Sequence, residues 1–410
     1  MPAQLRPRRH ARSGEVEAVT VHAPIASAGI DPGIAASVEE FIALRRDLHR
    51  HPELAFRETR TSAIVAGRLA SYGYEVTTGL AGTGVIGQLR KGDGLRRLGL
   101  RADMDALPIA EQTDRAYASE TAGVMHACGH DGHTAILLAA AKRLAERDFS
   151  GTLNLIFQPA EEIGAGARKL LSEGLFERFP CDAVFGLHNW PGVPSGQFGF
   201  VEGPAMAAVD KAIIRIVGRG GHGASPHETV DPVVAASSLV LALQSIVSRN
   251  IDPRQAAVVT VGSIHGGEAS NVIPDAVELK LTIRSFDAGV RAQLEERIPA
   301  LARAQAESFG ATAEVSYRRG FPPLTNHVAE TQLAREVALA AFGAGKVEHD
   351  FKPRMASEDF AFLLEACPGS YFFVGNGESA PLHSPAYDFD DRLIAPAATF
   401  WVRLARTFLV

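Results

Sequence analysis

HTAILLAAAKRLAERDFSGTLNLIFQPAEE, residues 133–162, predicts a helix that is followed directly by a buried strand. The first half is rich in Ala and Leu and carries Lys142 and Arg143 late, as helices often do. The second half is a short apolar run that stops at Pro159, which is typical of a strand inside a sheet. Strand patterns recur at 83–90, 96–106 and 182–191, and helix patterns at 36–50, 59–72 and 167–179. Strands that alternate with helices predict an α/β fold, with helices on both faces of one sheet.

The pattern changes near residue 208, where a half-exposed alternation replaces the continuous apolar runs. From 208 to 320 the order is strand, helix, strand, strand, helix, strand, which is typical of a ferredoxin-like α+β sandwich. We therefore expect a small domain at 208–320, inserted into a larger domain made of 34–207 and 321–410. We expect residues 1–33 to form a loosely ordered extension.

The composition argues against several classes of protein. The chain has 410 residues, 46% hydrophobic and 21% charged, as expected for a soluble globular protein of two domains. The net charge of −6 gives no reason to expect a nucleic-acid partner, and no run reaches the ~18 apolar residues of a membrane helix. The start lacks the apolar core of a signal peptide, and three cysteines are too few for a disulfide framework. We therefore expect a cytoplasmic protein.

Residue types that bind metals follow the predicted strands of the larger domain at five separate places. They are Asp103 and Asp105 after the strand at 97–102, Cys128 and His130 in the loop before a helix, Glu161 and Glu162, His188, and His383. In open α/β sheets, ligands bind at the carboxyl ends of the strands. We therefore expect these side chains to converge on one rim of the sheet.

Two chemistries fit such a collection. A cysteine nucleophile with a base is possible for Cys128 and His130, but it leaves the glutamates and the other histidines without a role. A metal site uses all of them, and thiolate, imidazole and carboxylate together suit zinc, manganese, cobalt or nickel. About six ligands exceed one tetrahedral site, so we expect two divalent ions that share one bridging ligand.

The adjacent glutamates, Glu161 and Glu162, can take two different roles. One can bind metal while the other faces a water molecule, because successive residues of an extended segment point to opposite sides. A metal lowers the pKa of water from 15.7 to about 7, which is worth roughly 12 kcal/mol. A glutamate with a pKa of about 4.3 can then accept the proton and pass it to a leaving amine.

A series of short stretches carries a family resemblance. They are RRDLHRHPELAFRE, LRADMDALPIAEQ, HACGHDGHTAILL, FQPAEEIGAGA, GLHNWP, GRGGHGASPH, NVIPD, TIRSFD, SEDFAF and LHSPAYDFDD, in order from residue 45 to 391. As a set they resemble the di-metal amidohydrolases and exopeptidases that include aminoacylase, bacterial glutamate carboxypeptidase and succinyl-diaminopimelate desuccinylase. The nearest likeness is to the branch of hippurate hydrolases and plant auxin-conjugate amidohydrolases.

The resemblance implies a metal-ligand set. Cys128 takes the bridging position, Glu162 and His383 complete one metal site, and His130 and His188 complete the other. It also implies that Glu161 is the general base and acid.

One motif departs from the peptidase relatives. Where they have His-x-Asp, this chain has Arg101-Ala102-Asp103, and the loss of that histidine fits His130 taking its place. Asp103 would then orient a ligand or tune the site. We assign no chemistry to His126, Asp131 or His133, which we expect to be loop and helix-start residues.

The inserted segment is similar to the family's lid and dimerisation domain. The resemblance implies that His222 polarises the scissile carbonyl, often across a dimer, which is an oxyanion-type role. It implies that Asn271 and Arg284 hold the substrate carboxylate, and a guanidinium suits a carboxylate because two N–H groups can pair with it. His227 is a further candidate for substrate binding. We expect a homodimer or a higher oligomer.

The resemblance implies a metal-dependent hydrolase of N-acyl or N-aroyl amino acids such as hippurate. Water activated by zinc or manganese, or else cobalt or nickel, attacks the amide, and a carboxylic acid and an amino acid leave. A dipeptidase or other exopeptidase of the same mechanism is the nearest alternative. A metal-free cysteine amidase and a non-catalytic binder of amino-acid conjugates are the other two.

Overall fold

The computed structural model describes residues 29–410, so most of the predicted extension lies outside the described residues. The extension was expected to end at residue 33, but the first helix begins one residue before that boundary. Helix α1 (Pro32–Arg50) already begins at Pro32, and the Asp31 side chain caps it by accepting hydrogen bonds from its first backbone amides. Asp31 also forms ion pairs with Arg143 and Arg147. These contacts hold the start of α1 against the rest of the fold.

The main sheet has eight strands in the order β1-β2-β4-β3-β5-β16-β6-β15. They are β1 (Glu75–Leu80), β2 (Gly84–Lys91), β4 (Gly151–Gln158), β3 (Arg97–Asp103), β5 (Ala183–Trp190), β16 (Gly369–Gly375), β6 (Phe198–Gly199) and β15 (Val347–Glu348). The central strands β4, β3, β5 and β16 are parallel to their neighbours among these four, and β1 and β2 are antiparallel at one edge. Because β3, β4, β5 and β16 run the same way, their carboxyl ends share one rim.

Helices cover both faces of the main sheet, as the alternation predicts. One face packs against α1, α2 (Thr59–Ser71), α3 (His130–Ala145), α8 (Val328–Phe342) and α10 (Ile394–Phe408). The other face packs against α4 (Gly166–Ser172), α5 (Leu175–Arg178) and α9 (Phe360–Ala366). The predicted α/β fold class is confirmed.

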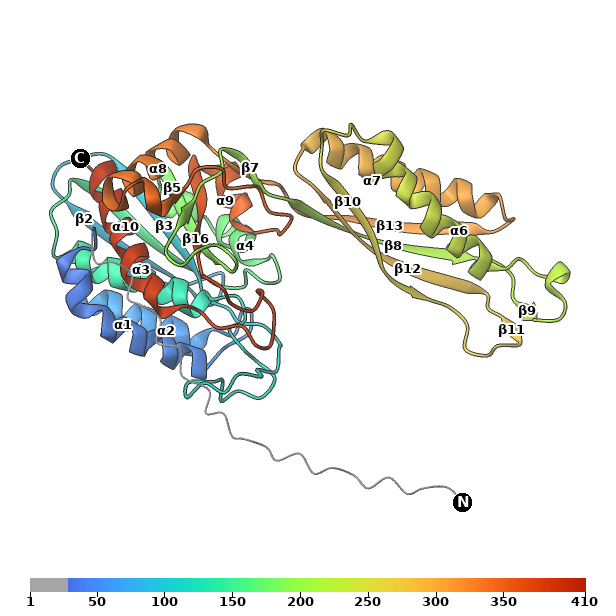
Figure 1. Ribbon diagram of the computed structural model, residues 1–410, viewed down its shortest axis with the longest axis horizontal. Coiled ribbons are helices and arrows are strands. Elements are labelled where there is room, and N and C mark those ends of the chain that lie inside the picture. Colours follow the sequence, from blue (N-terminus) through green and yellow to red (C-terminus); the bar gives the residue numbers. More distant parts are fainter. Residues whose placement is uncertain (1–28) are drawn as a thin grey trace, which may run out of the picture.

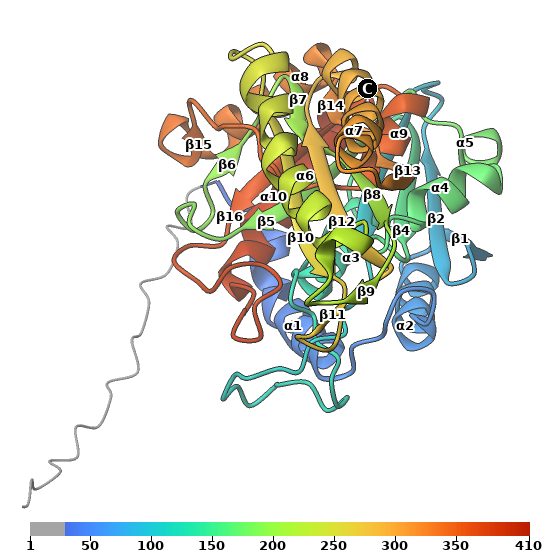
Figure 2. The same cartoon turned by 90° about the vertical axis from the view of Figure 1, so that its right-hand side faces the viewer.

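The inserted segment (residues 208–321) carries a second sheet with its own apolar core. Its elements are β8 (Ala208–Val217), α6 (Pro232–Ser245), β10 (Ala257–His265), β12 (Ala276–Ser285), α7 (Ala288–Glu307) and β13 (Thr312–Phe321). The strands are antiparallel in the order β10-β12-β8-β13, and α6 and α7 lie side by side on one face (Figure 2). This is the ferredoxin-like order that the sequence predicts.

Short strand pairs mark the two ends of the inserted segment. Near the main sheet, β7 (Gly203–Met206) pairs with β14 (Leu324–Asn326), so the two connecting chains run side by side. At the far end, β9 (Gly221–His222) pairs with β11 (Val272–Ile273), and we call this strand pair with its loops the tip (Figure 1). The inserted segment therefore holds the tip far out from the main sheet.

Several elements differ from the sequence prediction. The predicted helix at 167–179 is two helices, because Gly174 adopts a left-handed φ of 84° between them. The first helix predicted for the inserted segment is α6, which is followed by a π-helical turn, Ile246–Asn250. The sequence analysis misses β1 and the short strands, since two to six residues carry little periodicity.

Within residues 29–410, one helix is long and apolar enough to cross a membrane, Pro232–Asn250. This candidate differs from the expectation that no run in the chain is long and apolar enough to span a membrane. Length and composition alone are weak evidence, because helices of soluble proteins also pass this test. The described helix packs one side against the inserted sheet, and Val233, Val234 and Leu241 are exposed on it.

Candidate metal centre

The predicted metal ligands meet at one rim of the main sheet. Cys128 lies in the loop before α3, and His130 is the first residue of α3. Glu162 follows β4, His188 lies near the end of β5, and His383 lies in the loop after β16. We call these five residues, together with Glu161, the rim cluster.

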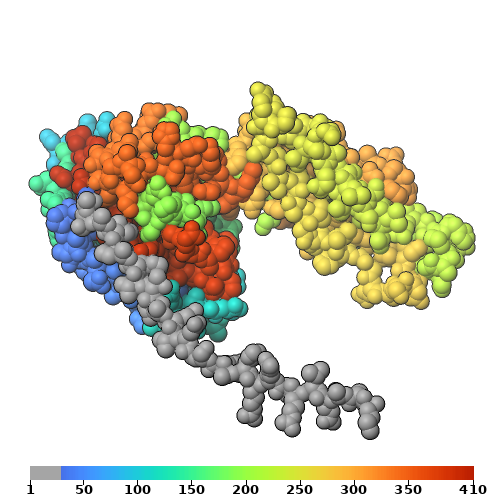
Figure 3. All heavy atoms as spheres, viewed as in Figure 1, coloured from blue at the N-terminus to red at the C-terminus, as the bar shows by residue number. Residues whose placement is uncertain are grey.

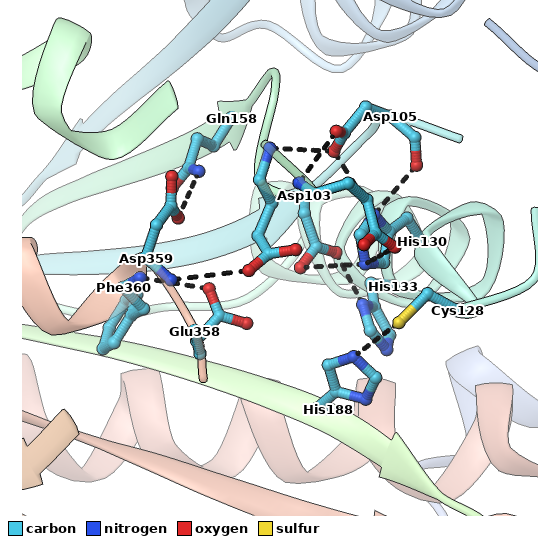
Figure 4. A network of polar contacts seen from close by, with 12 residues as sticks. Asp103, Asp105, Cys128, His130, His133, Gln158, His188, Glu358, Asp359 and Phe360 are labelled. Atoms are coloured by element: carbon cyan, nitrogen blue, oxygen red, sulfur yellow. Dashed lines mark hydrogen bonds and ion pairs between the residues drawn. The ribbon is translucent and has the colours of Figure 1, made fainter. Parts of the chain in front are cut away.

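Cys128 lies at the centre of the rim cluster. Its Sγ is 3.3 Å from His188 Nε2, and Figure 4 shows the two side chains pointing toward one another. The ligand atoms of Cys128, His130 and His188 all lie within 4.8 Å of each other, and so do those of a second group, Cys128, Glu162 and His383. One thiol therefore belongs to two groups of three ligands.

The donor set fits divalent cations. Within the described part of the chain, His130 Nε2 and Glu162 Oε1 are buried without a hydrogen-bond partner, and both atoms point into the rim cluster. Buried polar groups left without partners cost free energy, which a bound cation would recover. Imidazole, thiolate and carboxylate are ligands that borderline divalent metals accept.

Backbone oxygens orient the two histidines of the first group. Nδ1 of His130 contacts the carbonyl oxygen of Asp105 at 2.9 Å, and Nδ1 of His188 contacts that of Asn189 at 2.6 Å. A carbonyl oxygen only accepts, so each Nδ1 must donate, which leaves each Nε2 free to bind a metal.

Asp105 also shapes the turn that carries the two glutamates. Its two carboxylate oxygens accept hydrogen bonds from the backbone N–H groups of Glu161 and Glu162, each at 3.0 Å. The preceding residue, Ala160, has a φ of 56°, and His383 has a φ of 63°. A left-handed conformation is uncommon for residues other than glycine and clusters at functional sites, where surrounding contacts hold it.

Asp103 lies behind the rim cluster and contacts a histidine that the sequence analysis left without a role. Asp103 Oδ1 is 2.6 Å from His133 Nδ1, and its Oδ2 is 3.7 Å from His130 Nε2. Nε2 of His133 contacts the side-chain oxygen of Asn189 at 2.8 Å. His133 lies one helical turn after His130, and this spacing on α3 is the signal that could have revealed it.

Arg101 neutralises a buried group of carboxylates beside Glu161. Its guanidinium donates to Asp103 at 2.6 Å, to Glu358 at 2.8 Å and to Asp359 at 3.2 Å, and it is only 1% exposed. Glu358 and Asp359 come from a different part of the chain, and the sequence analysis missed both. Glu161 lies against them, since its Oε1 accepts a 3.4 Å hydrogen bond from the Asp359 backbone.

Glu161 is nearly buried, with 6% of its surface exposed. Burial, followed by repulsion from Glu358 and Glu162, raises the pKa of its carboxyl well above its usual range. A carboxyl whose environment favours its protonated form is suited to exchange protons with a reacting group.

A cavity of about 900 Å³ lies above the rim cluster, between the main sheet and the inserted segment, where Figure 3 shows a notch. Its apolar wall is formed by Ile163, Trp190, Met206, Phe321 and Leu382. Arg284 also lines it, and its Nη1 donates to the carbonyl oxygen of Met355 at 2.7 Å and to Ser357 Oγ at 3.0 Å.

The other three predicted substrate residues lie elsewhere in this chain. His222 and Asn271 are neighbours at the tip, where His222 pairs with Val272 and Gly223 N donates to the carbonyl oxygen of Asn271. His227 is also at the tip, and its side chain is 77% exposed. None of the three lines the cavity. Within one chain, the structure does not bring them to the rim cluster.

A family model described as peptidase family M20/M25/M40 matches residues 99–407. The chain belongs to this peptidase family. This M20-family chain is 44% identical over 370 residues to the hippurate hydrolase of Campylobacter jejuni, covering 90% of this chain and 97% of that relative. It is 43% identical over 373 residues to the N-acetyl-L-cysteine deacetylase of Bacillus subtilis, covering 90% and 88%. The crystal structure of Bacillus subtilis YXEP, a dinuclear metal-binding peptidase from the M20 family, matches with a TM-score of 0.80 and 35% identity, covering 92% and 99%.

These likenesses confirm the resemblance that the sequence motifs carry. The M20-family chain is a metal-dependent amidohydrolase. Its candidate ligands and its likeness to a dinuclear member of the family support divalent metal ions.

Proposed function

We propose that this M20-family enzyme hydrolyses the amide bond of N-acyl or N-aroyl amino acids, such as hippurate, to a carboxylic acid and an amino acid. The observation that carries the proposal is the position of Glu161, which lies beside two ligand groups that share Cys128, at the floor of a cavity with an apolar wall. The apolar wall suits an acyl or aroyl group. The names of the relatives, a hippurate hydrolase and an N-acetyl-L-cysteine deacetylase, support the same substrate class.

We assign two metal ions to the rim cluster, zinc or manganese first and cobalt or nickel as alternatives. Cys128 belongs to both ligand groups, so it would contribute to both sites, with His130 and His188 holding one ion and Glu162 and His383 holding the other. Such ions, when bound, lower the pKa of water and polarise a carbonyl oxygen. Asp103 positions His133 and approaches His130 from behind.

Glu161 accepts a proton from the attacking water and donates it to the leaving amine nitrogen. The backbone N–H of Asp359 and the anchored turn above Asp105 hold its carboxyl in place. The guanidinium of Arg284 has donors left beyond its contacts with Met355 and Ser357, and it pairs with the substrate carboxylate.

The tip completes the site of a second copy. We propose a homodimer in which His222, Asn271 and His227 of one chain reach the cavity of the partner, because they are exposed and remote from their own rim cluster. Val233, Val234 and Leu241 on α6 and the edge strand β10 offer an interface. In this proposal the inserted segment is a separate lid and dimerisation domain, and the free thiols Cys128, Cys181 and Cys367 suit a reducing cytoplasm.

A metal-reconstituted activity screen tests the function. The purified protein is stripped with a chelator, loaded with one divalent ion at a time, and assayed on hippurate, N-acetyl amino acids and dipeptides. We expect metal-dependent cleavage of the N-acyl amino acids. A preference for dipeptides would instead indicate an exopeptidase, and activity that resists the chelator would indicate a cysteine amidase. If no metal confers turnover on any substrate, the chain is a binder.

A further inference from the structure

The inserted sheet carries basic side chains on the face that meets the cavity. Along β8 the even-numbered side chains are buried under α6 and α7, so the odd-numbered ones point to the opposite face. On that face Lys211 lies directly across from Arg318 of β13. Arg284 of β12 lies across from Val209, which is two residues before Lys211 on β8 and nearer the main sheet. All three basic side chains line the cavity.

On this face, a basic side chain far from the cavity has an acidic partner, whereas Lys211 and Arg318, which line the cavity, have none among the described residues. Farther out, Arg215 forms an ion pair with Glu314 at 3.2 Å. Within residues 29–410, by contrast, no carboxylate lies within ion-pair distance of Lys211 or Arg318. Like charges directly opposite each other on neighbouring strands destabilise a sheet. An anion bound between Lys211 and Arg318 would offset the repulsion between their two positive charges.

The acidic side chains of the cavity have partners of their own. Glu162 contacts His383 at 3.4 Å, and Glu358 accepts a hydrogen bond from Arg101 at 2.8 Å. Glu161 belongs to the rim cluster. A ligand that enters the cavity therefore meets Lys211 and Arg318 with their charges free.

We propose that Lys211 and Arg318 form a second anion subsite, which selects N-acyl amino acids that carry a carboxylate in the amino-acid side chain. The inference rests on the proposed function, in which Arg284 holds the α-carboxylate of the substrate. The pair lies two residues farther along β8, about 7 Å away, which long basic side chains can span. An N-acyl glutamate or aspartate with its α-carboxylate at Arg284 presents its second carboxylate to Lys211 and Arg318.

A second carboxylate could also come from the acyl half, as in an N-succinyl amino acid. The positions favour the amino-acid half, because Lys211 and Arg318 lie on the same sheet face as Arg284. Most of the apolar wall, including Trp190 and Leu382, belongs instead to the main part of the fold and suits the acyl group.

The test compares N-benzoyl-L-glutamate with N-benzoyl-L-glutamine, which have the same shape and differ by one charge. For the metal-loaded enzyme we expect kcat/KM to be about tenfold higher for the glutamate substrate, mostly through KM. The preference should shrink as the salt concentration rises. In the double variant Lys211→Gln and Arg318→Gln, the ratio of the two kcat/KM values should fall to about one.

Lys280→Gln is the control for loss of positive charge on the inserted sheet. Lys280 lies on β12 outside the cavity and pairs with Glu278 at 3.3 Å. Its substitution removes one positive charge where the double variant removes two, and it should keep the wild-type ratio. A wild-type ratio near one, or a ratio that survives the double substitution, overturns the proposal. A preference for N-succinylglycine over N-butyrylglycine without one for the glutamate substrate also overturns it, because the subsite then recognises the acyl half.

Cleavage of hippurate separates this inference from the proposed function. Hydrolysis of hippurate without a glutamate preference rejects only the second anion subsite. If no N-acyl amino acid is cleaved, the proposed function fails, and calorimetric titration of the metal-loaded protein with N-acetyl-L-glutamate and N-acetyl-L-glutamine decides the subsite. Equal affinities for the two ligands reject it.

Discussion

The rim cluster and the tip both carry histidines with predicted roles, but their surroundings are opposite. At the rim, His130 and His188 are buried, and backbone oxygens 2.9 and 2.6 Å from their Nδ1 atoms orient them. At the tip, His222 is exposed, and its Nδ1 accepts a 3.0 Å hydrogen bond from the nearby Ala224 backbone amide. The side chains of the rim cluster are oriented by contacts within one chain, whereas the tip residues His222, Asn271 and His227 do not line the cavity of their own chain. The proposed homodimer would account for this difference, because one chain would hold the metals and a second chain would supply the tip.

The largest effect should follow from Glu161→Gln. Because the proposed proton carrier is lost and no assigned ligand changes, we expect kcat on N-acyl amino acids to fall by roughly 10²–10⁴ while metal content stays at the wild-type level. Steady-state kinetics and elemental analysis measure the two quantities. Glu162→Gln is the matched control, and it should lose metal. Wild-type turnover in Glu161→Gln would refute its role.

His222→Ala should lower kcat by roughly 10²–10³ without changing metal content, because a group that polarises the carbonyl is lost. His349→Ala removes an exposed histidine of the main part of the fold and should leave activity unchanged.

Mixing the inactive variants Glu161→Gln and His222→Ala tests whether the tip acts across the dimer. After subunit exchange, each mixed dimer has one site with both native residues, so activity should return toward about a quarter of the wild-type level. If the mixture stays inactive while exchange is demonstrated, the tip does not act in the partner's site.

A buried ion pair between His49 and Asp131, next to the rim cluster, predicts a pH dependence of stability. Burial alone would lower the pKa of His49, but attraction to Asp131 and hydrogen bonds to Asp131 and Glu111 raise it to about 9. Since the folded pKa exceeds the unfolded value of about 6.5, this stabilisation is complete below pH 6.5 and disappears as the pH rises through about 9. It amounts to roughly 3 kcal/mol.

Urea unfolding across this pH range should therefore show a loss of stability in the wild type that His49→Gln lacks. His51→Gln, a substitution at a partly exposed histidine two residues away, should retain it. An unchanged pH dependence in His49→Gln would assign the effect to other groups.

The smallest effect should come from Leu241→Glu on α6. Leu241 is 76% exposed in the single chain, so the charge should not unfold it, but it would be buried at the proposed interface. We expect a shift from dimer to monomer by light scattering, and activity about tenfold lower that recovers as protein concentration rises. Leu95→Glu, at an exposed leucine of the main part of the fold, is the control. A dimer unaffected by Leu241→Glu would place the interface elsewhere.

Much of the rim could be predicted because it follows from local sequence. The ligands lie near the end of a strand, in a loop that follows a strand, or at the start of α3, and parallel strands bring their carboxyl ends together. Arg101, Glu358 and Asp359 could not be linked in this way, because they meet through a packing of segments about 257 residues apart. His133 could have been placed near the rim from its spacing on α3, but its partners Asp103 and Asn189 come from two other strands and could not be predicted.

The sequence by itself determined the alternation of strands and helices, the change of pattern near residue 208, and the side chains available for metal binding, because periodicity and residue chemistry are local properties. Only the tertiary structure decided that His133 contacts both Asp103 and Asn189, that Arg101 neutralises the carboxylates beside Glu161, and that His222 lies away from its own rim cluster. These are distances between segments far apart in the chain, and long-range packing sets such distances.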